Sequence, residues 1–96
     1  MQMLTVICDA GVEERVLEGL RQIGVPGYSR VSDLTGLGRT GRREGDPIWP
    51  GTNSLILVSV PDEEVESILA MLRSLKSEYT RPPALHVFST PASDLL

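Results

Sequence analysis

Two periodicities alternate along the chain and predict six elements. Short runs of aliphatic and β-branched residues occupy positions 3–8, 28–34, 54–60 and 84–89, and glycine, proline or polar residues follow each of them, as expected for strands. Two stretches between these runs repeat apolar residues every three or four positions and carry acidic residues at their start, which predicts amphipathic helices over 12–23 and 62–76. The predicted order is strand, helix, strand, strand, helix, strand.

This order predicts an α+β fold of the ferredoxin-like type, βαββαβ, with a four-stranded antiparallel sheet and two helices on one face. The runs at 3–8 and 54–60 are apolar at successive positions, so both faces of the central strands carry aliphatic side chains. Two helices cover only one face, and each aliphatic side chain left in water forfeits roughly 1.5–3 kcal/mol. The pattern therefore predicts a homo-oligomer that covers the second face. The alternative is that the C-terminal tail, residues 90–96, folds over it.

The segment 35–53 follows neither periodicity. It holds five of the nine glycines, two prolines and three arginines, and loops of this length in compact domains are often functional. Backbone amides beside glycines and arginine side chains both bind anions, so the segment predicts a site for phosphate, an adenine nucleotide or bicarbonate, unless its arginines are simply solvated. The candidate ligand-binding residues are Gly36, Leu37, Gly38, Arg39, Thr40, Gly41, Arg42 and Arg43.

Two further features of this loop bear on its function. Residues 36–41 satisfy G-x-G-x-x-G, but a dinucleotide fingerprint requires a helix to start there, and residues 42–47 do not open one. Trp49 lies beside Pro50 and Gly51 in a predicted turn. Its side chain either packs back on the protein's own assembly or contacts a partner or a ligand base.

Composition narrows the function classes. With 96 residues we expect one domain, residues 1–96, and 41% hydrophobic with 23% charged residues is typical of a globular chain. Nine basic and thirteen acidic side chains give a net charge of −4, which argues against nucleic-acid binding over the whole surface. No apolar run approaches the roughly 20 residues of a membrane helix, so we expect a cytoplasmic protein without membrane insertion. No serine, histidine and aspartate pattern indicates a nucleophile, so we expect no enzyme.

A metal site is a second hypothesis. Cys8, the single cysteine, ends the first predicted strand, and His86, the single histidine, lies in the fourth strand, which neighbours the first in this topology. Thiolate and imidazole together suit a transition metal such as copper, zinc or nickel, particularly where a symmetry axis joins copies. The alternative is that both are packing residues.

Three segments resemble the PII family of signalling proteins and its PII-like relatives. They are GVPGYSRVSDLTGLGRTG at 24–41, similar to the family's second strand and its G-F-G-R-Q-x-G motif, LILVSVPDEEVESILAML at 55–72, and LTVICDAGVEERVLEGL at 4–20. The resemblance implies a trimer of ferredoxin-like protomers with their sheets facing inward. It also implies that the loop 36–53 contacts a protein partner, either a membrane transporter or a regulatory protein, and that ADP or ATP binds between subunits at its base.

The chain departs from the family's pattern in the other half of that site. The segment SEYTRPPALHVF at 77–88 contains no glycine where the family has a threonine- and glycine-rich phosphate loop, and no arginine-rich segment follows the fourth strand. Thr40 stands where the family has a glutamine that helps to hold magnesium and 2-oxoglutarate. These departures favour a reduced or altered ligand site. The related CutA proteins, associated with copper tolerance, imply the alternative of a metal-binding or metal-responsive module.

Overall fold

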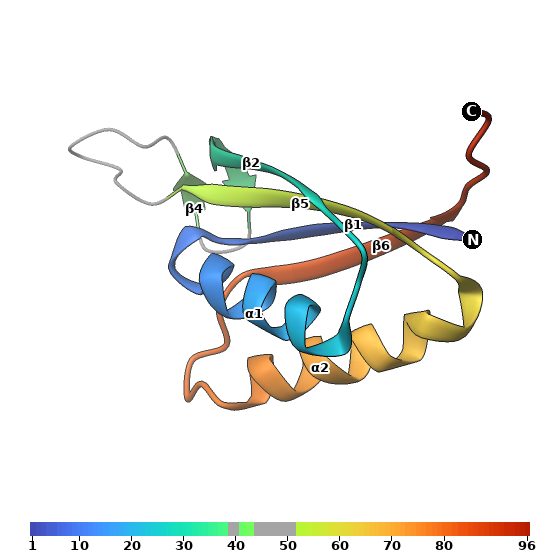
Figure 1. The fold of residues 1–96 in the computed structure, drawn as a ribbon. Helices are drawn as coiled ribbons and strands as arrows, with labels where there is room; N and C mark the ends of the chain where they lie inside the picture. Colours follow the sequence, from blue (N-terminus) through green and yellow to red (C-terminus); the bar gives the residue numbers. More distant parts are fainter. Residues whose placement is uncertain (39–40, 44–51) are drawn as a thin grey trace.

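The computed structural model describes residues 1–38, 41–43 and 52–96, and it contains a four-stranded antiparallel sheet with two helices on one face (Figure 1). The strand order is β2-β5-β1-β6. The elements of this body are β1 (Gln2–Asp9), α1 (Glu13–Ile23), β2 (Ser29–Leu34), β5 (Asn53–Val60), α2 (Val65–Ser77) and β6 (Leu85–Pro91). The predicted βαββαβ order and the ferredoxin-like fold are confirmed.

Local chemistry explains where α1 begins and ends. The Asp9 carboxylate accepts a hydrogen bond from the Gly11 amide at 2.8 Å, which starts a 3₁₀ turn at Ala10–Val12 ahead of the helix. At the other end, Gly24 adopts a left-handed conformation with φ 90°, and its amide donates to the carbonyls of Leu20 and Arg21. A second 3₁₀ turn, Asp62–Glu64, precedes α2, and it has no side-chain cap but is closed by the Glu64 amide, which donates to the Pro61 carbonyl at 3.0 Å.

The core lies between the helices and one face of the sheet. Alternate positions of the central strands point into it, so that Leu4 and Val6 of β1 and Ile56 and Val58 of β5 are buried. The helices contribute a matching apolar stripe. Its buried members are Val16, Leu17 and Leu20 of α1 with Ile68, Leu72 and Leu75 of α2.

The other face of the sheet has no layer over it in the described part of the chain, and we call it the open face. Strand register places the following residues on it: Met3, Thr5 and Ile7 of β1, Val31 of β2, Leu55 and Leu57 of β5, and His86 and Phe88 of β6. Val31 is 50% exposed and Phe88 58% exposed. The residues after β6 do not shield this face, because Leu95 and Leu96 are themselves exposed. The predicted apolarity of both strand faces is therefore confirmed.

Two segments differ from the sequence-based expectations. Part of the loop predicted to lack regular structure forms a small antiparallel hairpin, β3 (Gly36–Gly38) with β4 (Gly41–Arg43), because backbone pairing holds these residues without any hydrophobic alternation. The last strand continues two residues beyond the predicted end, to Pro91, since Met3 and Gln2 still offer partners to Thr90 and Pro91. None of the helices among the described residues is long and apolar enough to cross a membrane.

Candidate functional site

Three connections meet at one end of the main sheet: the base of the loop 35–53, the turn after β1, and the connector 78–84 between α2 and β6 (Figure 1). Backbone hydrogen bonds hold them together. The Ala10 amide donates to the Thr52 carbonyl at 3.0 Å, and the Asp9 amide donates to the Ala84 carbonyl at 2.8 Å. The turn after β1 is thus fixed between the returning loop and the connector.

The base of the loop has an irregular backbone. The pairing of β2 with β5 shifts between Val31 and Leu34, and Asp33 in this bulge has φ 61°, a left-handed conformation that is rare for a residue other than glycine. The bulge changes the direction of the chain where it leaves the sheet. The two short strands of the hairpin follow directly.

The hairpin brings together six of the eight predicted ligand-binding residues. Its register pairs Gly36 with Arg43, Leu37 with Arg42, and Gly38 with Gly41. A Cβ at Gly36 would meet nothing within 4 Å, so a ligand can approach the backbone there. Arg39, Thr40 and the predicted partner contact Trp49 lie outside the described residues.

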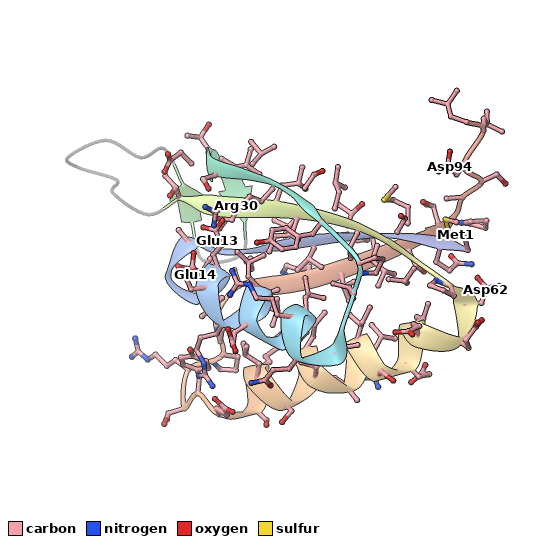
Figure 2. All side chains as sticks on the ribbon, in the orientation of Figure 1. Met1, Glu13, Glu14, Arg30, Asp62 and Asp94 are labelled. Carbon is pink, nitrogen blue, oxygen red and sulfur yellow. The ribbon has the colours of Figure 1, made fainter. Side chains whose placement is uncertain are left out.

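A polar network fastens β2 to the start of α1 beside this base. The Arg30 guanidinium lies 3.4 Å from a Glu13 carboxylate oxygen and 3.2 Å from one of Glu14, and the Ser32 hydroxyl donates to Glu13 at 3.3 Å (Figure 2). The Glu13 side chain is only 12% exposed, so this pair is better shielded from water than an ordinary surface ion pair. Arg30 was not among the predicted site residues, because alternation with apolar Val31 would assign Arg30 to the solvent side. Strand register instead pairs Arg30 with core-facing Ile56, on the helix side of the sheet.

A second network ties the connector to α1. Arg15 forms an ion pair with Glu78, donates to the Tyr79 hydroxyl at 3.2 Å, and lies 5.7 Å from the centre of the Tyr79 ring. The hydrogen bonds to Tyr79 and Glu78 raise the pKa of the Arg15 guanidinium, so it stays charged. This contact holds the glycine-free connector next to the helix start.

Two polar atoms at the point where the loop returns to the sheet are buried without a hydrogen-bond partner in the described structure. They are Asn53 Oδ1 and Ser54 Oγ, and the Ser54 residue is fully buried. Unsatisfied buried polar groups of this kind are uncommon and mark places where a bound group can add a bond. Neither residue stood out in the sequence.

The two predicted metal ligands do not converge within the protomer. Cys8 pairs with Leu85 and His86 pairs with Ile7, so Cys8 points into the core and His86 onto the open face. Burial, followed by the nearby charges of Glu13 and Asp9, raises the pKa of the Cys8 thiol to about 11, which disfavours the thiolate that binds metals. The described residues hold no cluster of three or more histidine, cysteine or carboxylate side chains suited to a metal.

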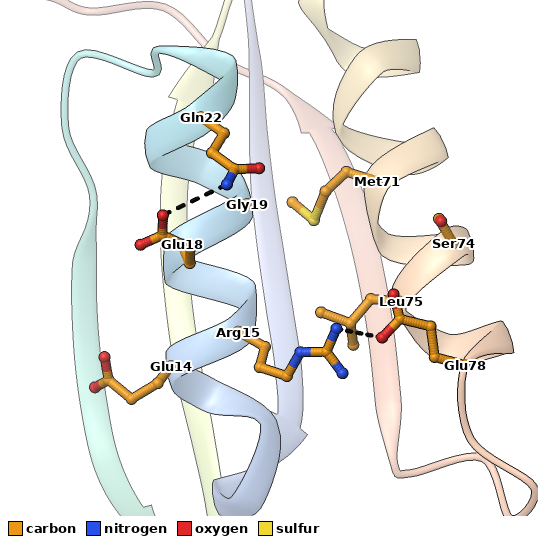
Figure 3. A pocket seen from close by; sticks show the side chains of 9 residues that line it. All are labelled: Glu14, Arg15, Glu18, Gly19, Gln22, Met71, Ser74, Leu75 and Glu78. Carbon is orange, nitrogen blue, oxygen red and sulfur yellow. Dashed lines mark hydrogen bonds and ion pairs between the residues drawn. The ribbon is translucent and has the colours of Figure 1, made fainter.

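A groove of about 380 Å³ runs between the two helices on the outer side (Figure 3). Its floor is apolar at Met71 and Leu75, and α1 can approach α2 closely there because Gly19 has no side chain. The carboxylates at its rim are already engaged by arginines, as in the pairs Glu78 with Arg15 and Glu18 with Arg21. The groove adjoins the two networks described above, because Glu14, Arg15 and Glu78 also line it.

Comparison with known proteins identifies the family. The sequence model of the family described as nitrogen regulatory protein P-II matches residues 1–95. The chain belongs to the nitrogen regulatory protein P-II family. Among curated protein sequences, none matches the chain significantly.

Solved structures of P-II-like proteins share this fold. CPII from Thiomonas intermedia K12 bound to ADP and bicarbonate is 25% identical, with a TM-score of 0.72, over 93% of this chain and 84% of that one. A 2.3 Å structure of CPII bound to ADP, AMP and bicarbonate is 23% identical, with a TM-score of 0.72, over 96% of this chain and 93% of that one. The apo form of CPII is 22% identical, with a TM-score of 0.63, over 93% and 89%.

Proposed function

We propose that the chain is a P-II-like regulatory protein that binds a small anionic ligand, ADP or ATP, between the copies of a homotrimer. The observation that carries this proposal is the similarity over 93% of the chain to CPII, a P-II-like protein seen with ADP and bicarbonate bound. The loop base supports it from the chain's own residues, because a glycine hairpin and arginines are suited to phosphate oxygens.

The trimer in this proposal is supported by the open face. Leu55 and Leu57 of β5 lie beside Ile7 of β1 on a surface with no covering layer in the described part of the chain, and exposed patches of this kind mark protein interfaces. Copies that pool these faces would bury them together. Clefts between copies would then form next to the loop base, where each ligand would contact two chains.

Signalling to a protein partner is the regulatory half of the proposal. A ligand shifts the loop 36–53 between states only if it binds one state more tightly than the other. Contacts from the hairpin arginines to the ligand would favour one arrangement of the loop, and Trp49 would then meet a membrane transporter or a regulatory protein.

Isothermal titration calorimetry tests whether the protein binds an adenine nucleotide. We expect heat on titration of the purified protein with ADP, AMP and ATP, each with and without bicarbonate. Hydrogen bonds to charged groups are worth roughly 1.5–3 kcal/mol, so Arg39→Ala should weaken binding by about 10- to 150-fold. Arg21→Ala is the matched control, since Arg21 lies at the far end of α1 from the loop base. Absence of heat with every nucleotide in the wild-type protein would remove the nucleotide from the proposal.

A further inference from the structure

A second, smaller groove lies at the edge of the molecule between α2 and β6, and we call it the edge groove. Its volume is about 190 Å³, and it is lined by Leu69, Leu72, Arg73, Lys76, Leu85 and Val87. Cavities of roughly 150 Å³ with aliphatic walls accommodate a molecule as large as benzene, so this groove has room for an aliphatic side chain. Because β6 is the outermost strand on this side of the sheet, the groove is accessible from the edge.

The edge groove combines an apolar floor with positive charge. Its charged lining residues are Arg73 and Lys76, and none of the described residues that line it carries a carboxylate. The Arg73 side chain is 71% exposed, and its carboxylate neighbour, Glu66, lies at 3.8 Å, a long separation for an ion pair. Lys76 Nζ donates to the Leu85 carbonyl at 3.3 Å, which positions a cation beside the strand. The groove therefore suits an acidic segment with leucine side chains.

The residues after β6 have that chemistry. The Ala92 amide still donates to the Met1 carbonyl at 3.1 Å, and beyond it the sequence is Ser93, Asp94, Leu95 and Leu96. Asp94 accepts a hydrogen bond from the Leu96 amide at 2.9 Å, so this end is turned (Figure 2). Leu95 is 90% exposed and Leu96 is fully exposed, and two adjacent leucines in water are costly unless something covers them.

We propose that residues 94–96 of one copy dock in the edge groove of a neighbouring copy, with a leucine on the floor and Asp94 near Arg73. The length of the tail favours docking on a second copy over docking on its own chain. The groove contacts the first half of β6, at Leu85 and Val87, whereas the tail leaves from the other end of that strand. The four residues 93–96 span about 13–14 Å when fully extended. If the tail turned back along β6 to reach the groove of its own chain, it would need nearly all of that length.

This inference rests on the homo-oligomer within the proposed function, although it does not depend on any nucleotide. The contact would join each protomer to the next through its tail, in addition to the open face. Burial of one leucine at roughly 1.5–3 kcal/mol corresponds to about a 10- to 150-fold gain in the affinity of one copy for the next.

Cysteine cross-linking in the full chain tests the inference. We expect Leu96→Cys combined with Leu69→Cys to give covalent dimers and trimers on mild oxidation, because a disulfide needs Cα atoms within about 7 Å. The native Cys8 is buried and does not compete. The matched control combines Leu96→Cys with Ala70→Cys, which lies on the exposed side of α2, and it should cross-link at least 10-fold less.

A charge swap tests the register of the tail. Asp94→Lys in the cross-linking pair should lower the yield severalfold, and adding Arg73→Glu should restore it. A disulfide within single chains, or equal yields from the pair and its control, would overturn the inference. Sedimentation of the same variants separates the two claims, since a stable monomer contradicts the proposed assembly, whereas an intact oligomer without cross-links contradicts only the tail contact.

Discussion

The chemistry of Cys8 follows from its place at the end of β1. The side chain lies in the core beside Ser54 of β5, and two carboxylates, those of Glu13 and Asp9, are close enough to oppose a negative charge on it. Both effects disfavour the thiolate, so the thiol stays protonated and unreactive in the folded protein. A small apolar side chain serves the same packing role.

The thiol makes stability fall at alkaline pH. Its pKa rises from an ordinary value of 9.0 to about 11 on folding, so between these values the unfolded chain loses a proton that the folded chain keeps. The contribution of the protonated Cys8 thiol to the unfolding free energy is complete below pH 9 and is lost as pH rises toward 11. We expect Cys8→Ala to flatten the decline of unfolding free energy over this range, measured by urea titration. Identical slopes in both proteins would contradict a protonated thiol in the core.

The separation of Cys8 from His86 shows what single residues reveal before a structure is known. Cys8 shares its parity along β1 with Leu4 and Val6, so its inward direction was predictable once the core face was known. The direction of His86 follows from strand register, because it pairs with Ile7 and not with Cys8. Proximity of two strands predicted a shared site, but the alternation of side chains places the two residues on opposite faces.

At the scale of elements, hydrophobic periodicity predicted both helices and the four strands of the main sheet. The signal is strongest for β1 and β5, which bury alternate apolar residues, and weakest for β2, none of whose residues is buried. The hairpin of β3 and β4 was not predicted, because its six residues are mostly glycine and arginine and depend on backbone pairing. The bulge at Asp33 was not predicted for a related reason. Its left-handed backbone is a consequence of tertiary pairing between β2 and β5, which leaves no pattern in the sequence.

The sequence predicted which segment forms the candidate site, but not how that segment lies against the neighbouring turn and connector. Glycines and arginines indicated the loop 35–53, whereas the approach of the Asp9–Ala10 turn to Thr52 and Ala84 depends on contacts between distant parts of the chain. The same holds for the network that joins Arg15 to Glu78. Long-range pairing of this kind carries no local signal.

The end of α1 gives a stability prediction with an internal control. Gly24 has φ 90°, where a Cβ is strained, so Gly24→Ala should cost about 1–2 kcal/mol of unfolding free energy. Gly27 has no positive φ, and a Cβ there would also meet nothing within 4 Å. Gly27→Ala should therefore be neutral or stabilising by up to about 1 kcal/mol. Equal losses in urea titrations of the two variants would show that φ at Gly24 does not set the cost.

The whole molecule is organised by the two faces of its sheet. The helices bury one face, and the open face retains aliphatic residues such as Ile7, Leu55 and Leu57 without a covering layer in the described part of the chain. The sequence predicted this imbalance because the central strands are apolar at successive positions, which a two-layer protomer does not require. The proposed association through the open face would bury these residues, and single substitutions can separate association from folding.

Leu57→Asp places a charge at the middle of the open face, next to Thr5 on β1 and Ser29 on β2. Since the side chain points away from the core, we expect the protomer to stay folded by circular dichroism. A charge buried without a partner between copies costs about 3–5 kcal/mol, a factor of about 150 to 4,000 in association, so the variant should sediment as a monomer at micromolar concentration. Ala70→Asp, on the exposed side of α2, is the control and should assemble like the wild type. If Leu57→Asp sedimented with the wild-type mass, the open face would not be the interface, and the clefts proposed for the ligand would have no second wall.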